Sequence, residues 1–391
     1  MSDEVLTAEQ RDLRDLVRTV VRERVAPRAA EIDATAEFPW DVVEAFREAD
    51  IFALPFAERH GGTGTGTLMF LVAIEEIARA CASSALILAL QELGALALKL
   101  AATEAQQDRW LPKLASGEWL GAYALTEAEA GSDAAALRTR AVRDGDGWVI
   151  DGTKRFISNA GVAGLYTVFA RTSDEQGHRG ISCFVVEADA PGFSVSRLEH
   201  KMGIRGTTTG ELFFERCRVG ADNLVGEEGA GFAIAMQVLD RSRPGIAAQA
   251  LGIAAGATDV ALEYAKARKT FGKSIAEHQL VAAMLADMET RTEAARGLLY
   301  RVGRMLDERI DGPALTKAAA MAKLACSDAA MAVTTDAVQV LGGYGYVTEY
   351  PVERMMRDAK ITQIYEGTNQ VQRLVIAREM RAERRSPPPT S

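Results

Sequence analysis

The sequence predicts an α+β protein in which a helical segment, a β-rich segment and a second helical segment follow one another. Apolar residues recur at helical spacing over residues 1–120, short β-like runs fill residues 121–228, and longer helical patterns return over residues 229–383. Helices and strands are thus segregated rather than alternating, which argues against a βαβ nucleotide-binding fold. A chain of 391 residues is long enough for two or three domains.

The first segment is expected to be all helical. Leu13, Val17 and Val21 lie on one apolar stripe with charges opposite. The most apolar run, residues 85–102, is interrupted by Gln91, Glu92 and Lys99, so we expect a buried helix rather than a membrane span. The glycine-rich residues 61–66 lack the Lys-Ser/Thr of a phosphate loop, and we interpret them as a connector.

The second segment is expected to form a compact sheet or barrel, because several short strands at this spacing are typical of one. Its β-like runs are bounded by turn residues such as Gly145 and Gly147. The predicted strands cover residues 148–152, 165–170, 181–187, 193–198 and 211–217.

The third segment is expected to contain longer helices. Apolar residues repeat at helical spacing over residues 280–288 and 298–306. Pro313 suits the first turn of another helix, which the glycines at 342 and 343 would end. Residues 384–391 are basic and then proline-rich, and we expect a disordered tail.

Composition narrows the function classes. The net charge of −9 argues against broad binding to nucleic acid or to an anionic membrane. The four cysteines and four histidines are dispersed, so neither a metal site nor a disulfide framework is expected. The acidic N-terminus lacks an apolar signal core, and a cytoplasmic protein is therefore expected.

Glu366 is the candidate catalytic residue. It lies in a break between two helical patterns and is followed by Gly367, whose lack of a side chain would let a ligand approach closely. Thr368 or Asn369 can cap the next helix, whose buried side is predicted to include Leu374. An isolated glutamate at such a place is more often a cap or a salt-bridge partner.

Four other polar, glycine-bearing stretches stand out, at residues 123–133, 154–161, 268–274 and 338–346. The first offers hydroxyls and backbone amides that could grip a flat heterocycle, and the second places an aromatic ring and a hydroxyl on one face of a strand. The third could bind a phosphate with its basic residues. Taken singly, each also fits a structural role as a turn, a packed strand, a solvated helix end or a helix cap.

The residues of these stretches and of the one around Glu366, in this order, resemble the acyl-CoA dehydrogenase family over about residues 6–380. The matching motifs are Tyr-x-Leu-Thr-Glu-x-x-x-Gly-Ser-Asp at 123–133, Arg-Lys-Thr-Phe-Gly-Lys at 268–273, Gln-x-Leu-Gly-Gly at 339–343 and Gln-Ile-Tyr-Glu-Gly-Thr at 363–368. The resemblance implies an N-terminal helical domain, a middle β-barrel-like domain and a C-terminal four-helix bundle. It also implies FAD as the cofactor and a homotetramer built as a dimer of dimers.

The resemblance assigns the FAD contacts residue by residue. Phe156 and Ser158 stand where the family usually has Trp and Thr, which keeps a flat ring and a hydroxyl but loses an indole N–H. The implied FAD contacts are Tyr123, Leu125, Thr126, Gly131, Ser132, Phe156 and Ser158, then Arg268, Thr270, Phe271, Gln279, Gln339, Gly342 and Gly343 from across subunit interfaces, and finally Thr368 and Gln370.

The resemblance also implies an acyl-CoA substrate and a base. Some branches of the family place the catalytic glutamate where this chain has Ser242, so Glu366 is the implied base, as in the short- and medium-chain branches. The implied substrate contacts are Ser132, Leu239, Asp240, Arg243, Tyr365, Glu366 and Gly367. The expected reaction is α,β-dehydrogenation of a short- or medium-chain acyl-CoA to the trans-2-enoyl-CoA, with an electron-transferring flavoprotein as acceptor. The alternatives are an oxygen-using oxidase and a non-catalytic binding module.

Overall fold

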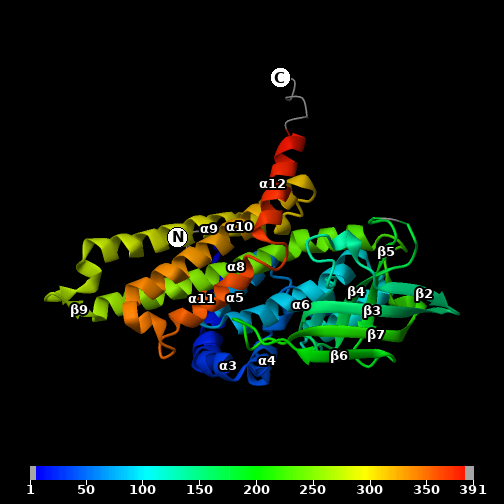
Figure 1. The fold of residues 1–391 in the computed structure, drawn as a ribbon, viewed down its shortest axis with the longest axis horizontal. Coiled ribbons are helices and arrows are strands. Elements are labelled where there is room, and N and C mark those ends of the chain that lie inside the picture. Colours follow the sequence, from blue (N-terminus) through cyan, green and yellow to red (C-terminus); the bar gives the residue numbers. More distant parts are fainter. Residues whose placement is uncertain (1–5, 176, 384–391) are drawn as a thin grey trace.

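The structure is a computed structural model that describes residues 6–175 and 177–383, so the predicted tail lies outside the described residues. Helices form one side of the molecule and a sheet forms the other, as Figure 1 shows. The α+β prediction, with helices first, strands second and helices last, is confirmed.

The N-terminal part is helical and supplies much of the apolar core. Its first helix begins at a capping box, in which Thr7 and Gln10 satisfy each other's backbone N–H groups. The run predicted as a buried helix forms α6, with Leu86, Ile87 and Leu88 almost fully buried. The α-helices are α2 (Ala8–Val20), α3 (Ala29–Thr35), α4 (Trp40–Glu48), α5 (Thr67–Ala80), α6 (Ala82–Ala101) and α7 (Glu104–Ala115).

The middle part is an eight-stranded sheet with strand order β6-β7-β3-β2-β4-β5-β8, and β1 pairs in parallel with β4. The five predicted strands correspond to β3 to β7 with longer limits for three of them, whereas β1, β2 and β8 were not predicted. The strands are β1 (Gly121–Ala124), β2 (Arg140–Asp144), β3 (Gly147–Ser158), β4 (Leu165–Arg171), β5 (Ile181–Glu187), β6 (Phe193–Leu198), β7 (Thr209–Gly220) and β8 (Leu224–Val225).

The C-terminal part consists of long helices that pack around α8, which contacts α5, α6, α9, α10 and α11. A short hairpin, β9 (Lys269–Thr270) with β10 (Lys273–Ser274), joins the first two of these helices. The helices are α8 (Gly231–Ala267), α9 (Gln279–Asp307), α10 (Pro313–Leu341), α11 (Val352–Thr362) and α12 (Asn369–Glu383).

The last helix departs from the prediction. In Figure 1, α12 projects away from the rest of the molecule. Leu374, predicted to lie on its buried side, is 69% exposed. The side of α12 that faces α10 instead buries Gln372. The prediction failed because apolar spacing alone does not show which face of a helix meets a neighbour within the same chain.

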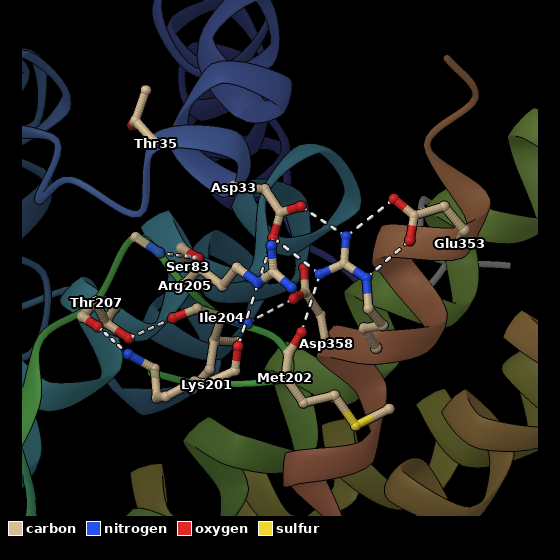
Figure 2. Close-up of polar contacts among 12 residues, drawn as sticks. Asp33, Thr35, Ser83, Lys201, Met202, Ile204, Arg205, Thr207, Glu353 and Asp358 are labelled. Carbon is tan, nitrogen blue, oxygen red and sulfur yellow. Dashed lines mark hydrogen bonds and ion pairs between the residues drawn. The ribbon is translucent and has the colours of Figure 1, made fainter. Parts of the chain in front are cut away.

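A polar junction joins the three parts of the fold at α11 (Figure 2). Arg357 of α11 donates to both carboxylate oxygens of Asp33 in α3, at 2.6 and 3.0 Å, and to the carbonyl of Met202 at 3.0 Å. The neighbouring Asp358 accepts a hydrogen bond from the backbone N–H of Ile204 at 2.5 Å. The β6–β7 connection and α3 are therefore both tied to the helix that leads to Glu366.

Two helices, α6 and α8, are long and apolar enough to cross a membrane by length and composition, but 83% of the most apolar window of each is buried inside the protein. Within residues 6–175 and 177–383 no group of three His, Cys, Asp or Glu side chains is arranged to hold a metal ion.

Candidate active site

Glu366 lies in a tight turn between α11 and α12. Its backbone has a φ of 55°, and Gly367 follows with a φ of 87°. Two successive left-handed residues are unusual, and glycine removes the strain only at the second. The buried Gln372 donates to the carbonyls of Glu366 and Gly367 at 3.1 and 2.9 Å and so holds the turn from the α12 side.

The carboxylate of Glu366 points at α8. The hydroxyl of Ser242 donates to its Oε2 atom at 2.6 Å. Burial raises the pKa of Glu366, whereas the Ser242 hydroxyl and the charges of Arg243 and Lys323 oppose the rise. The site therefore contains a half-buried carboxylate with a higher pKa than a solvent-exposed glutamate.

The predicted substrate residues of α8 lie beside this carboxylate. Arg243 is 5% exposed and pairs with Asp240 at 2.6 Å, while its Nε atom has no protein partner. Asp240 also accepts a hydrogen bond from Thr316 at 2.6 Å. Leu239 is partly buried on the same helix. The unpartnered Nε leaves a donor for a polar part of a ligand.

Two tyrosines border the same region. Tyr365 precedes the catalytic candidate, and its hydroxyl donates to Gln249 of α8. Tyr123 of β1 packs against Phe169, and its buried hydroxyl has no protein partner. Burial, and then the nearby charge of Glu366, raises the pKa of Tyr123. The strand β1 thus brings the first motif next to the carboxylate.

The loop after β1 is fixed by a buried ion pair. Lys154 of β3 is fully buried, and its Nζ atom donates to Glu127 at 2.7 Å and to the carbonyl of Leu125 at 3.1 Å. Thr126, between them, accepts a backbone hydrogen bond from Arg155 at 2.9 Å. The backbone that carries Leu125 and Thr126 is therefore anchored to the same strand as Phe156 and Ser158.

Phe156 presents an open aromatic surface. It has a φ of 57°, lies where the β3–β7 register shifts, and is 58% exposed. The side chains of Phe156 and Ser158 flank the buried Ile157. Gly131, beside the exposed Ser132, faces open space, because a Cβ added there would meet no atom within 4 Å. The exposed ring of Phe156 could lie against the face of a flat cofactor such as FAD, and the open backbone at Gly131 leaves room for a ligand.

The remaining predicted cofactor residues form a second group, which the structure places elsewhere. In Figure 1 the β9 hairpin lies at the opposite end of the molecule from β3. Arg268 lies over the ring of Tyr344, which follows the predicted Gln339, Gly342 and Gly343. Thr270 belongs to strand β9 of this hairpin, Gln279 begins the helix that follows it, and the ring of Phe271 is 97% exposed. A Cβ at Gly342 or Gly343 would meet no atom within 4 Å.

Thr368 and Gln370 flank the start of α12, close to Glu366. The hydroxyl of Thr368 accepts a hydrogen bond from the N–H of Val371 at 3.3 Å, as expected of a cap, and Gln370 is exposed. Sequence reasoning missed Lys323 and Gln372, which hold the Glu366 turn. A lone lysine within the alanine-rich run 318–325 was the only available signal for Lys323.

Comparisons with known proteins agree with this architecture. Family models described as the N-terminal, middle and C-terminal domains of acyl-CoA dehydrogenase match residues 7–118, 122–217 and 229–381. A cyclohexane-1-carbonyl-CoA dehydrogenase of Geobacter metallireducens is 49% identical over 96% of this chain and 98% of its own length.

Two solved structures are similar over the same span. Butyryl-CoA dehydrogenase from Megasphaera elsdenii aligns with a TM-score of 0.93 and 42% identity, covering 96% of this chain and 98% of the other. A chain from the structure of the electron-transferring flavoprotein of Acidaminococcus fermentans aligns with a TM-score of 0.94 and 44% identity, with the same coverage.

The fold and the matched domain models define a flavoprotein oxidoreductase. More particularly, the chain belongs to the acyl-CoA dehydrogenase family, whose three domain models it matches in order. Its cofactor is FAD, as the enzymes of this family use FAD. The prediction of the family and of its cofactor is confirmed.

Proposed function

We propose that the protein dehydrogenates a short- or medium-chain acyl-CoA between its α and β carbons, with Glu366 as the general base. The observation that carries this proposal is the position of the Glu366 carboxylate, which is held by Ser242 and lies beside the unpartnered groups of Arg243 and Tyr123. Such a carboxylate lies next to polar groups that are free to bind a ligand.

Glu366 removes the proton from the carbon next to the thioester carbonyl. A fully solvated carboxylate, with a pKa of about 4.3, is too weak a base for so weak an acid. Burial raises the pKa of Glu366 and thereby strengthens it as a base. The backbone N–H of Glu366 serves as a donor to the thioester oxygen as negative charge develops there. The chemistry that bound FAD would supply here is that of an acceptor for the hydride leaving the β carbon.

Ser242 supports this assignment of the base. It occupies the position from which other branches of the family supply their glutamate, and here its hydroxyl donates to Glu366 instead. Ser242 has no group that could act as a base at neutral pH. Asp240 forms an ion pair with Arg243 and accepts from Thr316, whereas Glu366 forms no ion pair within the described residues and is therefore the carboxylate available to act as the base.

The substrate enters along α8. Arg243 and Asp240 are placed to meet the polar pantetheine arm, while Leu239, Tyr365 and Gly367 border the acyl end. A short acyl chain is supported by the likeness to butyryl-CoA dehydrogenase, and a cyclic one by the likeness to cyclohexane-1-carbonyl-CoA dehydrogenase. Activity across straight, branched and cyclic acyl-CoA thioesters of increasing size identifies the preferred chain.

FAD is shared between subunits of a homotetramer. The two groups of predicted cofactor residues lie far apart in one chain, because the strand β3, which carries Phe156, and the β9 hairpin, which carries Phe271, lie at opposite ends of the molecule (Figure 1). The two groups of one chain cannot both contact the same FAD molecule. A neighbouring copy of the chain can supply the second group of contacts. Cofactor binding and assembly should therefore depend on each other, and FAD retention should fall on dilution.

An electron-transferring flavoprotein is the proposed electron acceptor. The likeness to a chain solved with such a protein from Acidaminococcus fermentans supports this choice. The alternative acceptor, molecular oxygen, predicts release of hydrogen peroxide during turnover in air. Absence of peroxide, together with acyl-CoA-dependent reduction of an electron-transferring flavoprotein, supports the proposal.

The test of the base is anaerobic mixing of the holoenzyme with butyryl-CoA. We expect the flavin absorbance to bleach in the wild type and not in Glu366→Gln. Glu263→Gln, an exposed glutamate near the end of α8, serves as the matched control and should bleach normally. Bleaching of Glu366→Gln at the wild-type rate shows that another group is the base. Bound flavin that no acyl-CoA thioester bleaches supports the non-catalytic alternative.

A further inference from the structure

Lys323 on α10 is a fully buried cation directly beneath the Glu366 turn. Its Nζ atom donates to the carbonyl of Gly367 at 2.8 Å and to Oδ1 of Asn369 at 2.9 Å. Lysine is almost never fully buried unless its charge is compensated, so a role for this charge is expected.

The partners of Lys323 are neutral oxygens. In the part of the chain that the structure describes, no carboxylate forms an ion pair with it, in contrast to Arg243, which pairs with Asp240 at 2.6 Å. The charge of Lys323 therefore interacts electrostatically with the carboxylate of Glu366 and, more weakly, with that of Asp328.

The turn needs such support because of its backbone. Glu366 has a φ of 55°, a left-handed conformation that is unfavourable for a residue with a side chain. Lys323 and Gln372 both donate to the carbonyl of Gly367, from α10 and from α12. These two hydrogen bonds fix the peptide between Gly367 and Thr368, and the bond from Gln372 to the carbonyl of Glu366 fixes the peptide that directly follows Glu366. Together they hold the turn that sets the direction of the Glu366 carboxylate and N–H.

The charged and titratable groups that face Glu366 come from three elements besides its own turn. They are Arg243 on α8, Lys323 on α10 and Tyr123 on β1, and the neutral hydroxyl of Ser242 on α8 faces Glu366 as well. Burial raises the pKa of Glu366, and Arg243 and Lys323 oppose this rise. Burial lowers the pKa of Lys323 to about 7, and Glu366 opposes that change. The two groups thus stabilise each other in their charged forms.

We propose that Lys323 is a positioning residue, which fixes the left-handed turn carrying Glu366 and keeps the Glu366 carboxylate ionised through its buried charge. The proposal rests on the role of Glu366 in the proposed function. Removing Lys323 should both loosen the turn and make proton loss from Glu366 less favourable.

The test compares Lys323→Met, which removes donor and charge, with the wild type. We expect the rate constant for anaerobic flavin reduction, and with it kcat, to fall about tenfold or more, because a displaced base no longer has the reactive geometry. The KM for the acyl-CoA should change by less than about threefold. The acid limb of the kcat/KM profile should move up by about one pH unit, since Glu366 loses a cation that favours its ionised form. Calorimetry of enoyl-CoA product binding in buffers of different ionisation enthalpy gives the number of protons exchanged on binding. The pH at which this number changes should also be higher in Lys323→Met than in the wild type.

Ser327→Ala is the matched control. Ser327 lies one turn further along α10, is equally buried and contacts Asn369 at 2.8 Å, but carries no charge. It should leave the acid limb in place. Lys323→Gln, which also removes the charge but keeps an amide, should move the limb as Lys323→Met does, and it replaces the latter in the test if Lys323→Met does not fold.

An acid limb that stays within about 0.3 pH units of the wild type in both lysine variants overturns the electrostatic role. An unchanged kcat in Lys323→Met overturns the positioning role. Glu366→Gln separates these failures from failure of the proposed function. If that variant is inactive while the lysine variants behave as wild type, only the role of Lys323 is wrong, and if it is active, the assignment of the base is wrong.

Discussion

Replacing Lys154 by methionine should destabilise the middle domain strongly. The ammonium group is fully buried and makes two hydrogen bonds, to Glu127 at 2.7 Å and to the carbonyl of Leu125 at 3.1 Å. Burial would raise the pKa of Glu127, but Lys154 and the donors at Thr139 and Arg138 hold it below its usual range. Removing the cation leaves this carboxylate charged and largely desolvated.

The size of the effect follows from these contacts. Breaking a buried ion pair from one side costs about 3–5 kcal/mol, because the remaining charge is no longer compensated. Glu127→Gln leaves the buried ammonium facing an amide and should cost about 2–4 kcal/mol. In the double variant no net charge stays buried, and the glutamine oxygen can still accept from the N–H of Arg138 or Thr139, which the carboxylate contacts at 2.6 and 3.0 Å. We expect it to lose only about 1–2 kcal/mol.

Urea unfolding followed by tryptophan fluorescence measures these differences, since Trp148 is buried in the same strand as Lys154. The double-mutant cycle should give a coupling free energy of at least about 2 kcal/mol. FAD retention should fall in Lys154→Met, because the ion pair holds the backbone of Leu125 and Thr126. The reasoning is refuted if the losses of unfolding free energy in the two single variants sum to within about 0.5 kcal/mol of the loss in the double variant.

Three further predictions concern single positions. Gly367→Ala should slow anaerobic flavin reduction about tenfold or more, because its Cβ would lie 2.6 Å from Nε2 of Gln372 at a φ of 87°, and a rate within about twofold of the wild type contradicts the role of the turn. In urea unfolding, the stability of Asp358→Asn relative to the wild type should increase by about 2 kcal/mol as the pH is raised from about 4.5 to about 7.5. Burial raises the pKa of Asp358 to about 6 although the N–H of Ile204 opposes this, so the folded wild type binds an extra proton at acid pH and its stability falls as the pH rises to about 6. Phe156→Ala should weaken FAD binding about tenfold by fluorescence titration while changing the stability of the apoprotein by less than about 0.5 kcal/mol, since the ring is exposed.

The sequence predicts the elements whose own side chains carry a periodic signal. The runs that became β4 and β5 contain apolar β-branched and aromatic residues and were predicted almost to the residue. By contrast, β1 is Gly121–Ala124 and three of its four residues are glycine or alanine, which favour strands little. It is a strand because it pairs with β4, and that pairing depends on the tertiary structure.

The same distinction applies to the active site. Glu366 could be singled out because it lies at a break in two helical patterns and within a family motif. Lys323 and Gln372 could not, because polar residues inside helices are usually solvated, and only the packing of α10 against α12 shows that these two are buried. Leu374 failed in the opposite direction, since an apolar residue at helical spacing proved to be exposed.

The geometry of Glu366 is set from both ends of its turn. On the α12 side, Gln372 holds the backbone, and on the α11 side, Arg357 fixes the preceding helix. The guanidinium of Arg357 has five N–H donors, and its five hydrogen bonds go to Asp33, Glu353 and the carbonyl of Met202 (Figure 2). Lysine could make at most three of these bonds and could not span two carboxylates in one plane.

Arg357→Lys should therefore affect catalysis although the side chain belongs to the junction of the three domains. We expect kcat to fall several-fold and the stability to fall by roughly 1–3 kcal/mol, because Asp33 and Glu353 lose charge-assisted hydrogen bonds. Anaerobic flavin reduction and urea unfolding measure the two effects. Arg354→Lys, a substitution of the same kind on the same helix, is the control. Equal losses of kcat and stability in both variants would show that the hydrogen bonds of Arg357 do not hold the Glu366 turn through α11.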